Sequence, residues 1–372
     1  MVIFISNFVS PHTIPFSEEL YNILGENFLF IETRQMTAER SSLGYDKLRS
    51  KPFVVSYKRF NLEKKKYQDL IGAADTVLAS YGSIDTALLE GRIANDKQTF
   101  LLSERLFKKG ILKLADPKLW KTVLFINRIK KKNFHLLCMG AYVAKDFARV
   151  GFPKEKMWKF GYITLPSQRP IEHILHSKCV LPTKILWVGR FIWWKQPLVA
   201  LKACYRLVTE GHDILLNVVG DGKMRNKVTE YLAKHDSHSR ISYSGLQDNA
   251  IVRQIMEESH ILLCTSNKLE GWGAVINEGM NAGCVVIANK KMGAAPYLIE
   301  HGKNGYLYDG TETALYETIK EAISNPLIAE VAKAAYQSMA NVWNPKDCAS
   351  RFVTFKDDCH NNRLKNGPFS KA

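Results

Sequence analysis

Short apolar runs alternate with amphipathic segments from the first residues of the chain onward. Strands are predicted at the runs VIFISNF, NFLFIET, DTVLAS, QTFLLSE and FHLLCMG, and near residues 157–162. Helical spacing of apolar positions predicts helices over 16–24, 67–74, 83–94 and 141–150. Alternating strands and helices indicate a parallel sheet. We therefore expect an α/β domain over residues 1–164.

The same alternation resumes after a stretch that we interpret as an inter-domain linker, residues 165–183. A strand is expected at Ile185 to Val188, and Pro197 suits the first turn of the helix that follows. Further on, the pattern predicts a strand over 261–264, a helix over 274–281 that ends before Gly283, and a strand at CVVIA. These elements indicate a second α/β domain over residues 184–345. A last helical segment lies in the tail, residues 346–372.

Two glutamates frame the predicted helix at 274–281. Glu270 lies in the loop before it and Glu278 about two turns along it. Gly271 and Gly273 let a ligand approach the backbone, and a helix N-terminus suits a diphosphate. One carboxylate would then reach sugar hydroxyls and the other a ribose, which makes this a candidate nucleotide-sugar site. The alternative is a pair of solvated capping glutamates.

Two basic residues follow the strand at 185–188. Arg190 and Lys195 would emerge at the carboxyl edge of the sheet, where open α/β sheets bind ligands. A guanidinium and an ammonium suit the oxygens of a diphosphate leaving group. Solvated loop residues are the alternative.

Together these residues resemble the C-terminal domain of GT-B glycosyltransferases, specifically the large retaining family 4. The resemblance runs from Lys184 to Asp309 and includes VVGDG at 218–222, ISYSG at 241–245 and Gly305-Tyr306-Leu307. It implies two Rossmann-like domains that face each other across a donor/acceptor cleft, with the terminal helix returning to the first domain. Where the family has Gly-Gly followed shortly by Glu, this chain reads GAAPY at residues 293–297. Tyr297 therefore stands at the position where the family has that Glu.

The resemblance also assigns roles by position. Arg190 and Lys195 would hold the donor diphosphate, with the amides of Gly273 to Val275 on the phosphates. Glu270 would contact donor-sugar hydroxyls and Glu278 the ribose. The full set expected at the donor is Gly189, Arg190, Lys195, Gly220, Gly245, Glu270, Gly271, Trp272, Gly273, Ala274, Val275 and Glu278.

The first domain should carry the acceptor. Prolines stiffen the loop SNFVSPHTIPF, so that Asn7 and His12 are candidates to face the ligand. Glu104 ends a predicted strand and is our candidate for orienting the acceptor hydroxyl, as a fourth catalytic residue beside Arg190, Lys195 and Glu270. Tyr81 stands at a comparable strand end. Capped loops with a surface histidine, and a Glu104/Arg105 surface pair, are the alternatives.

The formal net charge of +16 calls for a partner. Much of it lies in residues 107–132, where basic residues flank a Trp-bearing apolar stripe that suits an anionic bilayer. The residues that we expect to dock on the membrane are Lys108, Lys109, Trp120, Lys121, Lys130, Lys131 and Lys132. The alternative is an amphipathic helix packed on its own domain. We expect no nucleic-acid partner, because the chain has no nucleic-acid-binding signature.

The seven cysteines form no CxxC pair, and we expect reduced, mostly buried thiols. Residues 1–5 lack the basic start of a signal peptide, and no apolar run is long enough to span a membrane. The expectation is a cytoplasmic enzyme at the inner face of the membrane, without a metal or other cofactor, that transfers a sugar from a nucleotide diphosphate sugar, most often a UDP-sugar in this family. The acceptor would be a lipid-linked or membrane-proximal glycan. A GT-B-like epimerase or sugar-phosphate-dependent synthase, and a basic non-enzymatic adaptor, are the alternatives.

Overall fold

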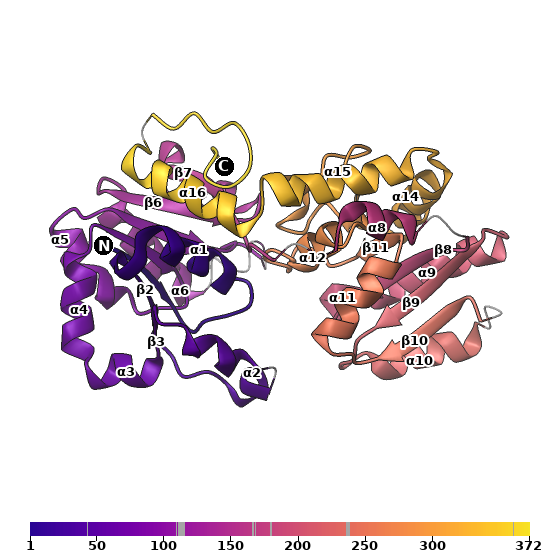
Figure 1. Ribbon diagram of the computed structural model, residues 1–372, viewed down its shortest axis with the longest axis horizontal. Helices are drawn as coiled ribbons and strands as arrows, with labels where there is room; N and C mark the ends of the chain where they lie inside the picture. Colours follow the sequence, from indigo (N-terminus) through magenta and orange to yellow (C-terminus); the bar gives the residue numbers. More distant parts are fainter. Residues whose placement is uncertain are drawn as a thin grey trace. The chain divides into compact units, whose positions relative to one another are not determined.

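The computed structural model describes residues 1–42, 44–108, 110, 116–165, 167, 169–178, 181–235, 239–359 and 361–372. The chain divides into two compact units. Unit 1 comprises residues 1–164 and 343–372, and unit 2 comprises residues 165–342 (Figure 1). The tail from residue 343 onward therefore belongs to the same unit as the N-terminus. Both units are parallel α/β domains.

Unit 1 is built on a seven-stranded sheet in the order β3-β2-β1-β4-β5-β6-β7, and every pairing is parallel. Its strands are β1 (Val2–Ser6), β2 (Phe28–Glu32), β3 (Val54–Val55), β4 (Thr76–Ser80), β5 (Thr99–Ser103), β6 (Phe134–Met139) and β7 (Met157–Phe160). Its helices are α1 (Ile14–Leu24), α2 (Ala38–Ser42), α3 (Tyr57–Leu62), α4 (Lys64–Ala73), α5 (Glu90–Ala94), α6 (Pro117–Ile129), α7 (Val143–Arg149) and α16 (Pro345–Asp357).

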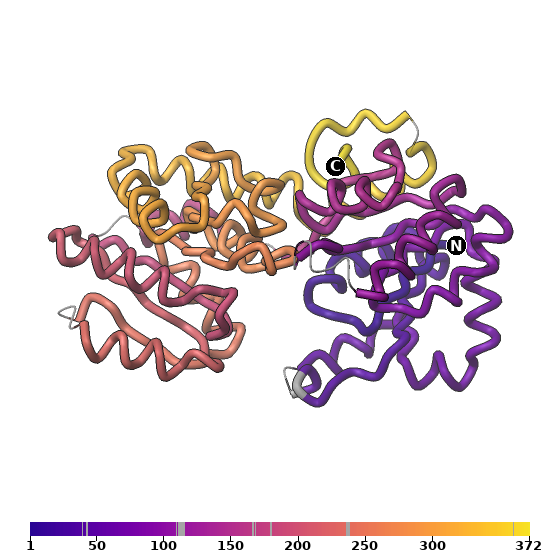
Figure 2. Tube along the Cα trace, turned by 180° about the vertical axis from the view of Figure 1, so that it is seen from behind, coloured from indigo at the N-terminus to yellow at the C-terminus, as the bar shows by residue number. Residues whose placement is uncertain are grey.

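The terminal helix α16 is tied to unit 1 by aromatic residues. Phe352 lies edge-on to Phe16 of α1 and to Phe100 of β5, with ring centroids 6.0 and 5.6 Å apart. Phe355 lies 4.9 Å from Trp158 of β7. Such aromatic contacts stabilise the packing beyond the apolar area that they bury. The tail that follows α16, yellow in Figure 2, stays within the same unit.

Unit 2 is built on a six-stranded parallel sheet in the order β10-β9-β8-β11-β12-β13. Its strands are β8 (Thr183–Val188), β9 (Ile214–Val219), β10 (Ile241–Gly245), β11 (Ile261–Cys264), β12 (Val285–Asn289) and β13 (Tyr306–Tyr308). Its helices are α8 (Ile171–His176), α9 (Pro197–Thr209), α10 (Arg225–Lys234), α11 (Asn249–Glu258), α12 (Val275–Asn281), α13 (Ala295–Leu298), α14 (Glu312–Ser324) and α15 (Ile328–Asn341).

Part of the segment that we expected to be a linker is folded. Residues 171–176 form α8, whose Ile171 and Ile174 are buried. Lys178, also buried, donates hydrogen bonds to the carbonyl oxygens of Ala282 and Gly283, which follow α12. Lys178 thus caps the carboxyl end of α12, and the apolar face of α8 is buried. Both contacts hold this segment on unit 2. The short strand β3 and the helix α3 were not predicted, because Val54–Val55 offers too few residues for a periodic pattern.

The cysteines that the structure describes are all buried and free, namely Cys138, Cys204, Cys264, Cys284, Cys348 and Cys359. Burial raises the pKa of each of these thiols. They pack as small apolar groups, as the sequence predicts for them. Cys179 lies outside the described residues. Among the described helices, none is both long and apolar enough to cross a bilayer.

Candidate functional site

In unit 2 the candidate donor site lies where the strand order of the sheet reverses. Strands β8 and β11 are neighbours at the centre of the sheet, and the chain runs outward from them in opposite directions. The loops after these two strands open at the same edge, which is where open parallel sheets bind ligands. The loop after β8 carries Gly189, Arg190 and Lys195. The loop after β11 carries Glu270.

Lys195 and Glu270 form an ion pair between these two loops. The ammonium Nζ lies 2.5 Å from the carboxylate Oε2, and each side chain is 18% exposed. Partial burial strengthens their attraction relative to a surface pair, yet both groups remain within reach of a ligand. An ammonium and a carboxylate side by side suit a ligand that carries both an anion and hydroxyl groups.

The backbone of Lys195 is fixed by a buried relay that the sequence did not point to. Trp187 of β8 donates its indole N–H to the Thr265 hydroxyl over 2.7 Å, and that hydroxyl donates to the Lys195 carbonyl over 2.6 Å. Both side chains are almost fully buried. The Asn267 amide also donates to the Trp194 carbonyl. A Thr directly after a buried strand was the available signal, but its partner 70 residues away could not be inferred from spacing.

Glycines let the loops of this edge pack closer than side chains would permit. A Cβ at Gly220, whose φ is +138°, would lie 1.9 Å from the Gly189 carbonyl oxygen. At Gly273, with φ +96°, it would meet the Met292 Cε at 2.5 Å and the Glu270 Cγ at 3.3 Å. Both backbones also have the left-handed φ that glycine tolerates. The expected glycines therefore shape the site.

The remaining expected donor residues differ in their exposure. Arg190 is exposed and makes no side-chain ion pair within the described ranges. The amides of Gly273 and Ala274 donate no hydrogen bond there either. The Trp272 side chain, by contrast, is 1% exposed and donates to Asn277. The buried Trp272 side chain therefore packs beneath the loop surface and supports the loop. Only the backbone of Trp272 can face a ligand.

Glu278 lies partly buried on α12. Burial raises the pKa of its carboxyl group above the usual range, and the charges of Arg253 and Lys195 oppose this shift.

Gly245 ends β10, and its carbonyl accepts from the Gly220 amide. Tyr297 lies edge-on to Trp272, with ring centroids 6.2 Å apart. Tyr297 thus stands beside the supporting indole.

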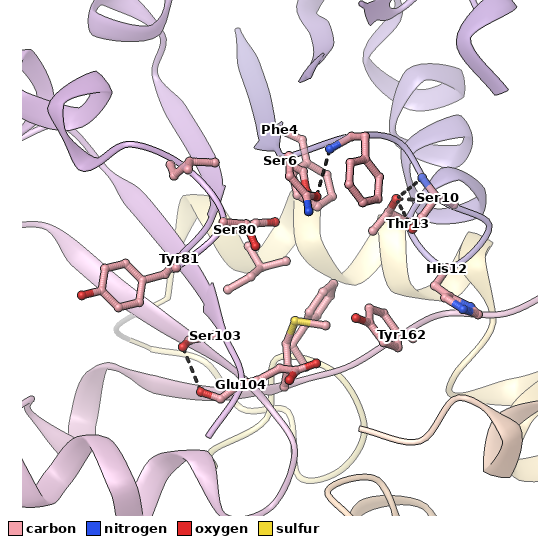
Figure 3. Close-up of a pocket in the computed structure, with 18 of the residues that line it drawn as sticks. Phe4, Ser6, Ser10, His12, Thr13, Ser80, Tyr81, Ser103, Glu104 and Tyr162 are labelled. Atoms are coloured by element: carbon pink, nitrogen blue, oxygen red, sulfur yellow. Dashed lines mark hydrogen bonds between the residues drawn. The ribbon is translucent and has the colours of Figure 1, made fainter. Parts of the chain in front are cut away.

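Unit 1 contains a cavity of about 1120 Å³ at the carboxyl ends of its own strands. The four residues that we expected on the acceptor side all line it, namely Asn7, His12, Tyr81 and Glu104. Figure 3 shows Tyr81 and His12 on opposite sides of the cavity, with Glu104 between them. The loops after β1 and β4 flank the point where this strand order reverses. The location again follows the rule for open sheets.

Ion pairs hold the loop after β5 in place. Glu104 pairs with Lys108, and the Arg105 Nε lies 3.3 Å from Asp146 Oδ2. The buried Asp146 also accepts from the Phe107 amide at 3.0 Å. The Glu104/Arg105 surface pair, weighed as an alternative, is therefore not what forms. Glu104 instead lines the cavity with a lysine as its partner.

Comparison with known proteins identifies the second half of the chain. Residues 180–339 match the family model described as glycosyl transferases group 1. This domain belongs to that family. The expected resemblance to GT-B glycosyltransferases is confirmed.

The relatives of this glycosyl transferases group 1 domain have diverged in sequence. The amylovoran biosynthesis glycosyltransferase AmsK of Erwinia amylovora is 25% identical over 209 residues, which cover 55% of this chain and 45% of that protein. The N-acetyl-alpha-D-glucosaminyl L-malate synthase of Bacillus anthracis is 30% identical over 129 residues, 35% of this chain and 32% of that protein. The matched segments span less than half the length of these curated relatives.

The fold extends over almost the whole chain. The crystal structure of Anabaena Alr3699/HepE in complex with UDP superposes with a TM-score of 0.70 at 16% identity, covering 96% of this chain and 99% of that one. The glycosyltransferase from Rickettsia africae gives 0.67 at 17% identity, covering 97% and 98%. Two Rossmann-like domains with the GT-B fold are thus confirmed.

Several residues of the unit 1 cavity were not singled out from the sequence. Tyr162 follows β7 and stacks on His12, with ring centroids 4.9 Å apart. Ser80 ends β4, Ser103 ends β5, and Arg34 follows β2. Polar residues at strand ends were the available signal. It is weak in isolation, because β1 and β2 also end in polar residues, Ser6 and Glu32.

Helix α6 packs its apolar face on its own domain, as the alternative to membrane docking anticipated. Leu119, Ile126 and Ile129 are buried. Trp120 and Leu124, four residues apart, nevertheless remain 57% and 67% exposed. Among the residues expected to dock, Lys108 and Lys121 line the unit 1 cavity, Lys131 is exposed, and Lys130 and Lys132 are partly exposed. Lys109 lies outside the described residues.

Proposed function

We propose that this protein is a retaining glycosyltransferase that transfers a sugar from a nucleoside diphosphate sugar to a lipid-linked or membrane-proximal glycan. The observation that carries the proposal is the Lys195–Glu270 pair at the strand reversal of a glycosyl transferases group 1 domain. Unit 2 would bind the donor. Unit 1, with its cavity at the corresponding strand ends, would bind the acceptor.

A UDP-sugar is the donor that we propose. The Anabaena protein with the same fold was solved with UDP and with UDP-glucose, and a pneumococcal O-GlcNAc transferase, GtfA, with UDP and GlcNAc. Lys195 and Arg190 would then take the diphosphate, with the backbone at Gly273 to Val275. Glu270 would accept hydroxyls of the sugar, and Glu278 those of the ribose.

The chemistry proposed for these residues is stabilisation of the departing diphosphate. The bond from the anomeric carbon to the phosphate oxygen breaks, and the acceptor oxygen bonds to that carbon on the same face. The acceptor proton passes to the departing phosphate. The cations Lys195 and Arg190 offset the negative charge that develops there. We propose that no metal is required.

The setting that we propose is surface polysaccharide or glycolipid synthesis at the inner face of the cytoplasmic membrane. The relatives AmsK and WcaL are named for amylovoran and colanic acid biosynthesis. Trp120 and Leu124 give α6 an exposed apolar pair beside basic residues, which suits peripheral binding to an anionic bilayer. Cosedimentation with phosphatidylglycerol vesicles should fall in Trp120→Ser/Leu124→Ser but not in Leu62→Ser, a change at another exposed leucine of unit 1.

The proposal is tested by measuring thermal stability of the purified chain with UDP, GDP, ADP, TDP and CMP. A ligand at about a hundred times its dissociation constant stabilises the native state by roughly 2.7 kcal/mol. We expect a shift with UDP that disappears in Lys195→Ala. Turnover of the matching UDP-sugar should need an acceptor and should persist in a chelator. Sugar conversion without any acceptor would identify an epimerase, and no shift with any nucleotide would favour the adaptor.

A further inference from the structure

Most of the charged side chains that line the cavity of unit 1 are basic. Six of its lining side chains are basic and one is acidic, among the residues that the structure describes. The basic ones are Arg34, Arg40, Arg105, Lys108, Lys118 and Lys121. They come from three separate parts of the chain, the segment after β2, the loop after β5, and α6. A concave wall that gathers like charges from distant segments raises the local concentration of anions.

Part of this charge is already balanced within the protein. Lys108 pairs with Glu104, and Arg105 pairs with the buried Asp146. The Arg40 guanidinium lies over the Phe8 ring, 4.1 Å from its centroid, which holds the side chain in place without neutralising it. These contacts leave the charge of the other basic residues for a ligand.

Arg34, Lys118 and Lys121 are exposed basic residues of the cavity wall. Within the described part of the chain, none of their side chains forms an ion pair with a carboxylate. Lys118 and Lys121 lie three residues apart on α6 and so lie near each other on the helix surface. Arg34 comes from the loop beyond β2. A guanidinium and two ammonium groups around one cavity suit an oxyanion with several oxygens.

We propose that the acceptor bound in this cavity is anionic, and that Arg34, Lys118 and Lys121 bind its phosphate or carboxylate oxygens. This inference rests on the proposed glycosyltransferase function. It assigns to these three residues a role in recognising the acceptor. Lys121, which we first expected on the membrane, then faces the acceptor.

The neighbouring surface favours a lipid-borne diphosphate as the source of that charge. Trp120 and Leu124 leave a large apolar area exposed on the helix that also carries Lys118 and Lys121. An acceptor with an isoprenoid chain and a diphosphate would match both surfaces of α6. An acidic glycan would match the basic surface alone.

The test measures binding of farnesyl diphosphate to the full-length protein in saturating UDP, which occupies the donor site. Farnesol serves as the uncharged lipid and tetragalacturonate as the acidic glycan. We expect farnesyl diphosphate to bind, and Arg34→Gln/Lys118→Gln/Lys121→Gln to weaken it by roughly tenfold or more, because charge-assisted contacts are lost. Added salt should weaken wild-type binding as well.

The matched control is Lys58→Gln/Lys64→Gln/Lys65→Gln, which removes the same charge from exposed lysines of α3 and α4. It should bind farnesyl diphosphate like the wild type. Tetragalacturonate binding in place of farnesyl diphosphate, lost in the cavity variant, supports the anionic site with a glycan as its source. Equal loss in both triple variants, retained binding in the cavity variant, or farnesol binding as tightly as its diphosphate overturns the inference.

The two proposals fail in different ways. If UDP binds but neither anionic probe does, the anionic acceptor is wrong and the proposed donor site stands. If UDP does not bind, the proposed function itself fails, whatever the probes do. The UDP affinity of both triple variants, measured without probe, separates these cases.

Discussion

The two candidate sites lie at equivalent positions of two similar sheets, yet they are built differently. In unit 2 the loops are in close contact, with the Gly189 carbonyl and Gly220 touching, and the key cation is paired with Glu270. In unit 1 the corresponding edge opens into a cavity of about 1120 Å³ whose charged lining residues are mostly basic. The first arrangement fixes a few groups for one ligand shape. The second leaves room for a larger and more variable ligand.

The difference teaches which part of such a protein carries a recognisable motif. Close contact between backbone segments requires glycine at particular positions. The donor side can therefore be recognised in the sequence from glycines, basic residues and glutamates at fixed spacing. A wide cavity can be lined by many residue types from many segments. Its chemistry emerges only when the fold places Arg34, Lys118 and Lys121 in the lining of one cavity.

The largest expected effect is on turnover, at the Lys195–Glu270 pair. We expect Lys195→Ala and Glu270→Ala each to lower the rate of sugar transfer by about 10²–10³-fold, because charge stabilisation at the departing diphosphate is lost. The measurement is steady-state release of the nucleotide. Lys202→Ala is the control, because it breaks an exposed ion pair between Lys202 of α9 and Glu312 of α14. Near-normal rates in both site variants would mean that chemistry does not take place at this edge.

The second prediction concerns the close contact that distinguishes unit 2. Gly220→Ala would place a Cβ 1.9 Å from the Gly189 carbonyl oxygen, and we expect a loss on the order of 3 kcal/mol in the free energy of unfolding. Gly302→Ala is the matched control, since its φ of +78° carries the backbone strain but nothing lies within 4 Å. It should cost about 1 kcal/mol. Equal losses in chemical denaturation would show that the loop contact does not matter.

The third prediction addresses the unit 1 cavity. Glu104→Gln should lower the rate of sugar transfer by about tenfold while UDP affinity stays unchanged. The attacking hydroxyl of the sugar acceptor would then donate its hydrogen bond to a neutral amide oxygen instead of a carboxylate. Glu90→Gln, which breaks an exposed pair with Arg128 in the same unit, is the control. A fall in UDP affinity with Glu104→Gln would place its effect on the donor side instead.

The sequence was sufficient to predict the strands that flank the sites. It was not sufficient to predict the side-chain contacts between distant segments that build the sites. Apolar runs such as Ile261 to Cys264 are unambiguous because both faces of a parallel sheet are covered. The relay from Trp187 through Thr265 to Lys195 depends on contacts between distant segments, and periodicity does not record these. For the same reason the sequence predicts a membrane partner for the charge on α6 but does not reveal that Lys118 and Lys121 also line a cavity.

The smallest expected effect contrasts stability with binding at one residue of unit 2. Burial raises the pKa of Glu278 in the folded state, so the folded protein holds this proton more tightly than the unfolded chain. That contribution to stability is present below the ordinary glutamate pKa and is lost as the pH rises through the raised value. Glu278→Gln should therefore unfold at a modestly higher temperature than the wild type at neutral pH, and at the same temperature near pH 4.

UDP affinity should fall in the Glu278→Gln variant, because a ribose hydroxyl would lose a charged hydrogen-bond acceptor. Glu330→Gln, at an exposed position of α15, should change neither quantity. A variant that is more stable at neutral pH yet binds UDP unchanged would remove Glu278 from the proposed donor contacts and leave its burial as a purely structural cost.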